Sequence, residues 1–177
     1  MTTGRAAACA VAFLALLPAA AGCGKSKPTG QEVAAQARAA AQWKAGLTRW
    51  RKESLQALDG ISVLLSTTSS LTGLEAARSR SSLRMTGFEQ TLARCSATVE
   101  ALGRVPDPLR PARRYALQAC KSLERGEALI EQAVYGLRHG RAGDGLRNGL
   151  IDRATGPLSD GQNELTVVGS VLAVGPQ

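Results

Sequence analysis

Apolar residues recur along most of the chain with the three-and-four spacing of one face of an α-helix. The clearest stripe lies between residues 85 and 102, and its members share a single helical face. They are Met85, Phe88, Leu92, Cys95, Val99 and Leu102. No segment shows a convincing alternation of period two, which is the pattern of a half-buried strand. The pattern therefore predicts an all-α protein.

A polar, partly β-branched segment separates the first two predicted helices. The first starts at Gln31, in a stretch rich in alanine, the best helix former, and ends in the cluster Ser66–Ser70. The second starts near Thr72, a candidate N-cap, and ends at Gly103, where we expect a left-handed C-terminal cap. Three prolines by residue 111 forbid continuation, because they remove donors and restrict the residues before them.

Two further helices follow this proline-rich segment. The third begins between Pro108 and Pro111, since proline is acceptable in a first helical turn, and ends in the glycine-rich stretch 140–145. Asp144 can cap the fourth helix, which we expect Gly156-Pro157 to break or kink. Four amphipathic segments with short connections predict an antiparallel up-down-up-down four-helix bundle.

The first 23 residues carry a different signal. Residues 6–21 form an uncharged, Ala- and Leu-rich run, shorter than the roughly 20 residues that a membrane-spanning helix needs. Arg5 precedes this run, and the small residues Ala20-Ala21-Gly22 lead directly to Cys23. The segment resembles the lipobox of bacterial lipoprotein precursors. This resemblance implies cleavage after Gly22, acylation of the Cys23 thiol by a palmitate-type anchor, and a mature protein tethered to the bacterial cell membrane outside the cytoplasm.

This interpretation divides the chain into three parts. Residues 1–22 are a cleaved signal peptide, residues 23–30 a lipidated tether and polar linker, and residues 31–177 the helical-bundle domain. Cleavage leaves 155 of the 177 residues, enough for one domain with a hydrophobic core. Fully extended, the linker reaches only about 25 Å, so we expect the domain to stay close to the membrane. The alternative is an ordinary secreted protein in which Cys23 is a spare thiol.

The four cysteines have separate expected roles. Cys9 is removed with the signal and Cys23 takes the lipid, which leaves Cys95 and Cys120 in a compartment where disulfides persist. These two lie almost equidistant from the proline-rich loop, so an antiparallel hairpin places them side by side. We therefore predict a disulfide that clamps the second helix to the third. Two buried free thiols are the alternative.

The chain is basic, and cleavage lowers the formal net charge only from +8 to +7. Such a charge favours anionic phospholipid, wall polymer or acidic protein as partners; we do not expect nucleic acid, which a protein outside the cytoplasm rarely meets.

Four arginines crowd the loop before the third helix and are candidates for contact with an anion or the membrane surface: Arg104, Arg110, Arg113 and Arg114. The predicted topology places this loop and the C-terminus at the membrane-proximal end. A solvated charged loop is the alternative.

Catalytic constellations are hard to find in the sequence. His139 is the single histidine, and it stands beside arginines near a predicted helix end. No cysteine or histidine set has metal-ligand spacing and no Glu-x-x-His motif occurs, so we expect no metal, no cofactor and no enzyme. Glu124, Glu127 and Glu131 share a helical face near His139, which a solvated surface explains as well as a catalytic one.

The remaining hypotheses concern binding. Trp43 and Trp50 lie seven residues apart on one helical face and are most simply core residues, although they could form an aromatic face for a ligand. The leading hypothesis is a non-catalytic, lipid-anchored bundle that acts as an interaction or scaffold module of the cell envelope, with an envelope protein as a possible partner. An extracytoplasmic binding module for a small or anionic ligand is second, and an enzyme third.

Overall fold

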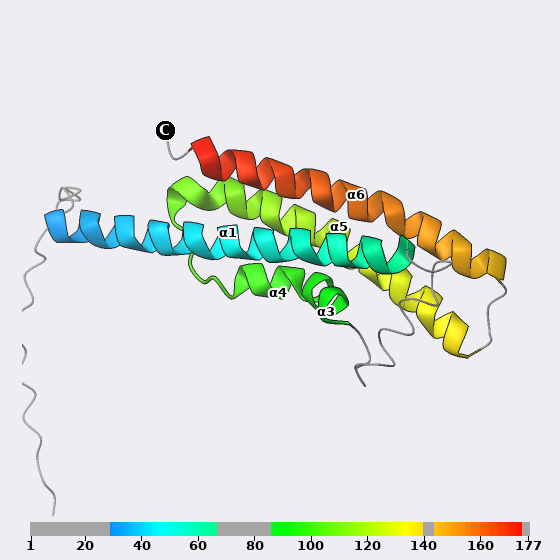
Figure 1. Ribbon diagram of the computed structural model, residues 1–177. Coiled ribbons are helices and arrows are strands. Elements are labelled where there is room, and N and C mark those ends of the chain that lie inside the picture. Colours follow the sequence, from blue (N-terminus) through cyan, green and yellow to red (C-terminus); the bar gives the residue numbers. More distant parts are fainter. Residues whose placement is uncertain (1–28, 67–85, 140–143, 175–177) are drawn as a thin grey trace, which may run out of the picture.

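The computed structural model describes residues 29–66, 86–139 and 144–174, and every regular element within these ranges is helical. Four helical layers pack side by side, each antiparallel to the next along the chain (Figure 1). They are α1 (Gly30–Ser66), the pair α3 (Gly87–Ala93) and α4 (Cys95–Glu100), α5 (Arg110–Arg138) and α6 (Asp144–Val174). The predicted all-α, up-down-up-down four-helix bundle is confirmed, with α3 and α4 together filling the second position.

The bounds of α1 agree with the sequence prediction, and a capping box fixes its start. The Thr29 hydroxyl accepts a hydrogen bond from the Glu32 N–H at 3.3 Å, and the Glu32 carboxylate accepts one from the Thr29 N–H at 2.7 Å. This reciprocal capping box satisfies two amides that a helix start leaves free. Residues 30–42 are exposed apart from the half-buried Ala40, and Figure 1 shows this part of α1 projecting beyond the other helices. Ala40 is the first residue of α1 that packs against the core, and Trp43 is the first that is buried.

The second helix was predicted as one continuous element, but the structure divides it into α3 and α4. Thr86 has an extended backbone (φ −67°, ψ 162°) and caps α3, and the chain turns again at Arg94 (φ −108°, ψ 14°) before α4. The predicted start near Thr72 lies outside the described residues. The turn at Arg94 is supported from another helix, because the N–H of Ser96 donates to Oε1 of Glu124 on α5 at 2.8 Å. A cap supplied across an interface cannot be read from the local sequence.

The break expected at Gly156-Pro157 does not occur. α6 is assigned as one helix from Asp144 to Val174, with Pro157 inside it. Proline removes one backbone donor and crowds the preceding turn, which commonly interrupts a helix. Here α6 packs closely along α5, and this tertiary packing outweighs the local penalty (Figure 1).

The short segment between α4 and α5 matches its prediction. Gly103 has φ +78°, the left-handed conformation that glycine adopts without steric cost, and it ends the α4 side of the hairpin. A 3-10 helix, η1 (Asp107–Leu109), leads directly into α5 at Arg110. The third helix therefore starts between the two prolines, as expected.

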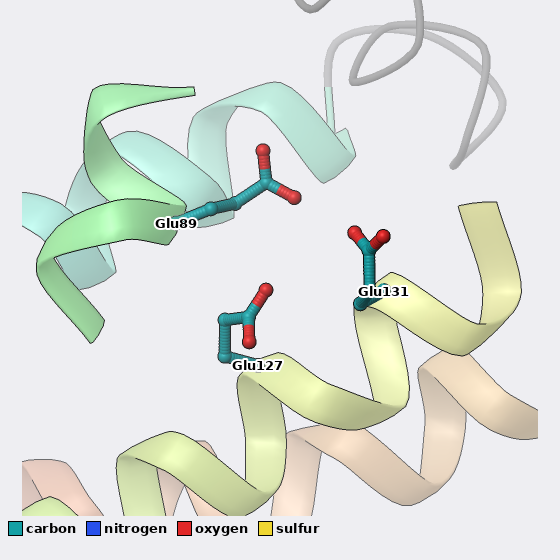
Figure 2. Close-up of side chains that lie close together, drawn as sticks. All are labelled: Glu89, Glu127 and Glu131. Carbon is teal, nitrogen blue, oxygen red and sulfur yellow. The ribbon is translucent and has the colours of Figure 1, made fainter. Parts of the chain in front are cut away.

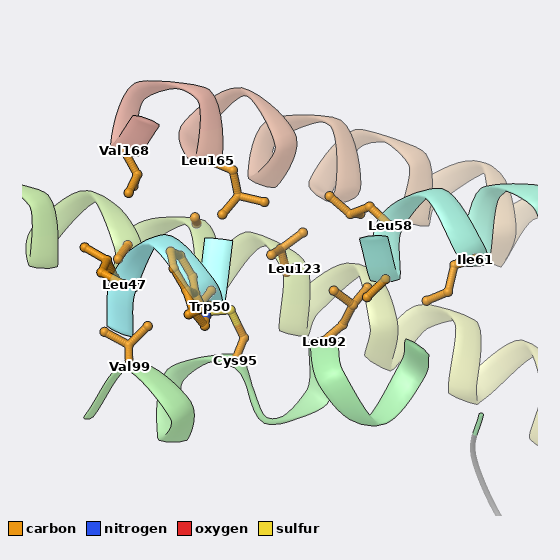
Figure 3. Close-up of a cluster of buried hydrophobic side chains, with 14 of the residues drawn as sticks. Leu47, Trp50, Leu58, Ile61, Leu92, Cys95, Val99, Leu123, Leu165 and Val168 are labelled. Carbon is orange, nitrogen blue, oxygen red and sulfur yellow. A yellow bond between two sulfur atoms is a disulfide. The ribbon is translucent and has the colours of Figure 1, made fainter. Parts of the chain in front are cut away.

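The core contains aliphatic side chains from all four layers (Figure 3). Its largest fully buried apolar members are Leu47, Ile61, Leu92, Leu123, Ile130, Leu165, Val99, Val134 and Val168. The stripe on residues 85–102 is only partly correct, since Phe88 is 42% exposed and the neighbouring Glu89 is buried in its place. Among the described helices, none is both long enough and apolar enough to cross a membrane.

Candidate functional site

The predicted disulfide between Cys95 and Cys120 is confirmed. It joins the first residue of α4 to the middle of α5, with a Cα–Cα distance of 5.1 Å. Both cysteines are buried, at 1% and 0% exposure. The bridge therefore fixes the turn at Arg94 against α5 from inside the core, where solvent does not reach the sulfur atoms.

The four loop arginines do gather at one end of the bundle. The loop between α4 and α5 lies at the same end as the projecting start of α1 and the end of α6 (Figure 1). Arg110 forms an exposed ion pair with Asp107 at 2.6 Å, which offsets its charge. The Arg114 guanidinium lies 5.2 Å from the centre of the Tyr115 ring, a cation–π arrangement. Arg104 and Arg113 complete the arginine loop, and Arg113 is half-buried.

A second basic region, missed by the sequence analysis, lies on α1. The helix up to residue 52 carries five basic residues against a single acid, Glu32. The basic residues are Arg38, Lys44, Arg49, Arg51 and Lys52. The rest of the helix, to Ser66, carries only the acids Glu53 and Asp59. Counting charge along the predicted helix would have revealed this division, and it places the positive charge near the arginine loop.

One of these residues, Arg51, is structural. Its Nε donates to the backbone carbonyl of Leu165 on α6 at 2.6 Å. The guanidinium lies over Gly169, where an added Cβ would come within 2.7–2.9 Å of its atoms. The lack of a side chain at Gly169 thus makes room for the Arg51 side chain, whose hydrogen bond connects α1 to α6.

Both tryptophans occupy the core, which confirms the simplest sequence expectation. Trp43 is 4% exposed and Trp50 is 3% exposed, and Figure 3 shows Trp50 beside Cys95. Neither indole Nε1 has a hydrogen-bond partner within the described part of the chain. A ligand face on these rings would need the surrounding helices to move apart, so it stays a hypothesis.

Three carboxylates meet between α3 and α5 (Figure 2). Glu89 from α3 and Glu127 and Glu131 from α5 place ligand atoms within 4.8 Å of one another. Glu89 is fully buried and accepts the Thr86 N–H at 2.7 Å, and Glu127 is 5% exposed. Carboxylate oxygens are the donors that hard cations such as Ca²⁺ and Mg²⁺ prefer. Each of the three acids also makes an interaction within the protein.

The three acids that the sequence analysis placed near His139 have partners elsewhere in the fold. Glu124 caps α4, and Glu127 and Glu131 face Glu89, which the sequence analysis did not identify. His139 is exposed, stacks on Tyr135 with ring centres 4.0 Å apart, and its Nδ1 lies 2.9 Å from the Tyr135 carbonyl. Glu89 was missed because it lies one position away from the predicted apolar stripe.

A partly open groove of about 460 Å³ separates α1 from α6. Its floor is apolar, from Leu55, Leu58 and Ile151, and its rim is polar, from Asp59, Ser159 and Gln162. Its volume falls in the range of about 300–1,000 Å³ that is typical of small-molecule sites. Cys23, the predicted lipidation residue, lies outside the described residues.

Comparisons with known proteins do not extend this picture. No protein-family model matches the chain, and no match was found among curated proteins or solved structures.

Proposed function

We propose that the protein is a lipid-anchored, non-catalytic helical bundle that acts as an interaction module on the extracytoplasmic face of a bacterial cell membrane. The observation that carries this proposal is the shared location of three features. The start of α1, which follows the predicted tether, lies at the same end of the bundle as the arginine loop and the end of α6 (Figure 1). A protein held by residue 23 presents this end toward the bilayer.

The exposed start of α1 supports the same arrangement. Residues 30–42 extend the helix by about 20 Å beyond its first buried residue, Trp43, at 1.5 Å per residue. A capped, alanine-rich helix is stiffer than a polar linker, so it fixes the distance along α1 between the tether and the bundle. The parts of the bundle that face away from the membrane are then free to meet an envelope protein.

The disulfide is consistent with a location outside the cytoplasm. Disulfides form and persist in oxidising compartments, and the bridge between Cys95 and Cys120 is internal to the bundle. In this setting Arg104, Arg113 and Arg114 contribute unpaired positive charge to the membrane-facing end, where anionic headgroups or wall polymer are the complementary partners.

Metabolic labelling with a clickable palmitate analogue tests the anchor. The natural chain is expected to incorporate the analogue and to fractionate with membranes. Cys23→Ser is expected to lose the label, whereas Cys9→Ser, the matched control in the removed segment, keeps it. Labelling that survives Cys23→Ser, or an unlabelled natural chain, would contradict the proposal.

The groove between α1 and α6 favours a second candidate, a binding module for a small ligand. Its apolar floor with a few polar rim groups is the usual composition of such sites. Thermal-shift screening should then find a compound that raises the melting temperature of the natural chain. Ser159→Trp on the rim should abolish that shift, and Ser170→Trp, at an exposed position of α6, should leave it unchanged. Equal shifts in both variants would remove the groove as the site.

A further inference from the structure

Three basic residues of α1 line its outermost face. Arg38, Arg49 and Lys52 are eleven and three residues apart, which is close to whole turns of a helix, and all three are exposed. The core residues Leu47 and Trp50 lie on the opposite side of the helix. Within the described ranges none of the three basic residues forms an ion pair. We call this set the α1 basic stripe.

The stripe does not have a stabilising role in the bundle. Its side chains contact no acid of another helix in the described structure, unlike Arg51, whose guanidinium is bonded to α6. Arg38 Nε donates to the carbonyl of Ala34 on its own helix at 3.3 Å, and even ion pairs at an exposed surface contribute little to stability. The positive charge on this face is therefore available to an external anionic surface.

The geometry of the proposed anchor limits how the arginine loop can meet lipid. Gly46 of α1 packs against Leu102, next to the start of the arginine loop, so the loop lies level with that part of α1. The helix begins 16 residues earlier, about 24 Å away along its axis. If α1 stood upright on the membrane, the loop would remain well beyond the roughly 8 Å over which charges act in physiological salt.

We propose that α1 lies along the anionic lipid surface and contacts the headgroups through the α1 basic stripe. This deepens the proposed function, because it rests on the acyl tether and names the surface that the tethered bundle presents. When α1 lies flat, its basic face meets the headgroups along the helix. Each basic residue near an anionic surface favours the bound arrangement by roughly fivefold.

Energy transfer on reconstituted protein tests the orientation. The acylated chain is placed in vesicles of phosphatidylcholine, with or without 30 mol % phosphatidylglycerol, that carry an acceptor dye on a headgroup. A donor dye is attached through Ala45→Cys, an exposed position between Arg38 and Arg49, or through Val167→Cys on the exposed face of α6. We expect stronger transfer from position 45 than from position 167 in anionic vesicles, and a smaller difference in neutral ones.

Two charge-reversed proteins separate the stripe from overall charge. Arg38→Glu/Arg49→Glu/Lys52→Glu should remove the excess transfer from position 45. Lys121→Glu/Arg125→Glu/Arg153→Glu changes the net charge equally at exposed positions of α5 and α6 and should preserve it. Circular dichroism confirms that both proteins are folded. Equal transfer from the two labels in anionic vesicles, or the same loss in both reversed proteins, would overturn the proposal.

A separate measurement shows whether the acyl anchor itself is present. Intact mass of the reconstituted protein shows whether the acyl group is present, and its absence would contradict the proposed anchor. The unacylated chain, with Cys9 and Cys23 replaced by serine so that the dye attaches at one position, is then added to the same vesicles, where a stronger signal from position 45 still supports the stripe and equal signals still overturn it. Energy transfer that is equal in neutral and anionic vesicles but changes when soluble polyphosphate is added would also overturn the lipid assignment. It would indicate that the stripe binds an anionic polymer.

Discussion

Leu123 of α5 lies directly against Gly161 of α6, in the space that a side chain would otherwise occupy. A Cβ on Gly161 would come within 2.5 Å of Leu123 Cδ2 and 3.4 Å of the Ala119 carbonyl. The relationship is repeated in reverse, because Leu158 of α6 lies against Gly126 of α5. In both pairs a leucine of one helix fills the glycine position of the other, which brings the two axes close and fixes their antiparallel register.

Gly161→Ala is expected to destabilise the protein more than Gly126→Ala. Leu123 is fully buried, whereas Leu158 is half-buried and has room to move outward. Overpacking a core costs about 1–3 kcal/mol, while replacing glycine by alanine in a helix gains about 1 kcal/mol. Urea unfolding should therefore show a net loss for Gly161→Ala and little change for its control. An equal or higher free energy of unfolding for Gly161→Ala would contradict this packing.

The cross-link between Arg51 and α6 predicts non-additive effects with Gly169. Arg51→Met keeps the apolar stem but loses the hydrogen bond to Leu165, which should cost about 1–2 kcal/mol. Gly169→Ala should cost a similar amount in the natural chain, because the new Cβ displaces the guanidinium. In the Arg51→Met background the same alanine should be neutral or slightly stabilising. A double-mutant cycle by chemical denaturation measures this coupling, and strict additivity would rule it out.

Loss of the disulfide is expected to lower the free energy of unfolding by about 3 kcal/mol. The bridge closes a loop of 25 residues, and the chain-entropy model assigns that value to a loop of this length. Cys95→Ser/Cys120→Ser should therefore unfold at lower urea concentration. Dithiothreitol should have little effect on the folded natural chain, because both sulfur atoms are buried. Rapid reduction of the folded protein would show that the bridge is more accessible than described.

The first turn of α1 should loosen at acid pH. The backbone N–H of Thr29, and then its hydroxyl, hold the pKa of Glu32 below its usual value. Because the folded-state pKa is lowered, the contribution of this cap is present above the unfolded pKa and is lost as pH falls through the folded one. NMR titration of the Glu32 carboxyl should show the low pKa, and Thr29→Ala should raise it toward normal. An unchanged pKa in the variant would contradict the hydroxyl contact.

Periodicity predicted the parts of the fold that depend on local sequence. The bounds of α1 and the start of α5 agree within a few residues, and the cysteine pair was placed correctly from its symmetry about the proline-rich loop. These features follow from amphipathic spacing, helix-breaking residues and hairpin geometry, all of which are visible in one sequence.

The errors occur where another helix determines the outcome. The turn at Arg94 depends on a carboxylate of α5, and the passage of α6 through Pro157 depends on its packing along α5. Gly161 and Gly169 are poor helix formers by local propensity, although each accommodates a side chain from a neighbour. The cluster around Glu89 was missed for a similar reason, since only the fold brings α3 beside Glu127.

Intact-mass analysis of the protein extracted from bacterial membranes tests the central claim most directly. A lipid-anchored, disulfide-clamped bundle predicts a chain that begins at Cys23, carries fatty acyl groups and has a mass lower by two hydrogens for the bridge between Cys95 and Cys120. A chain that retains residues 1–22 and carries no acyl group would contradict the anchor, whereas the orientation proposed for α1 is tested separately by the energy-transfer measurement.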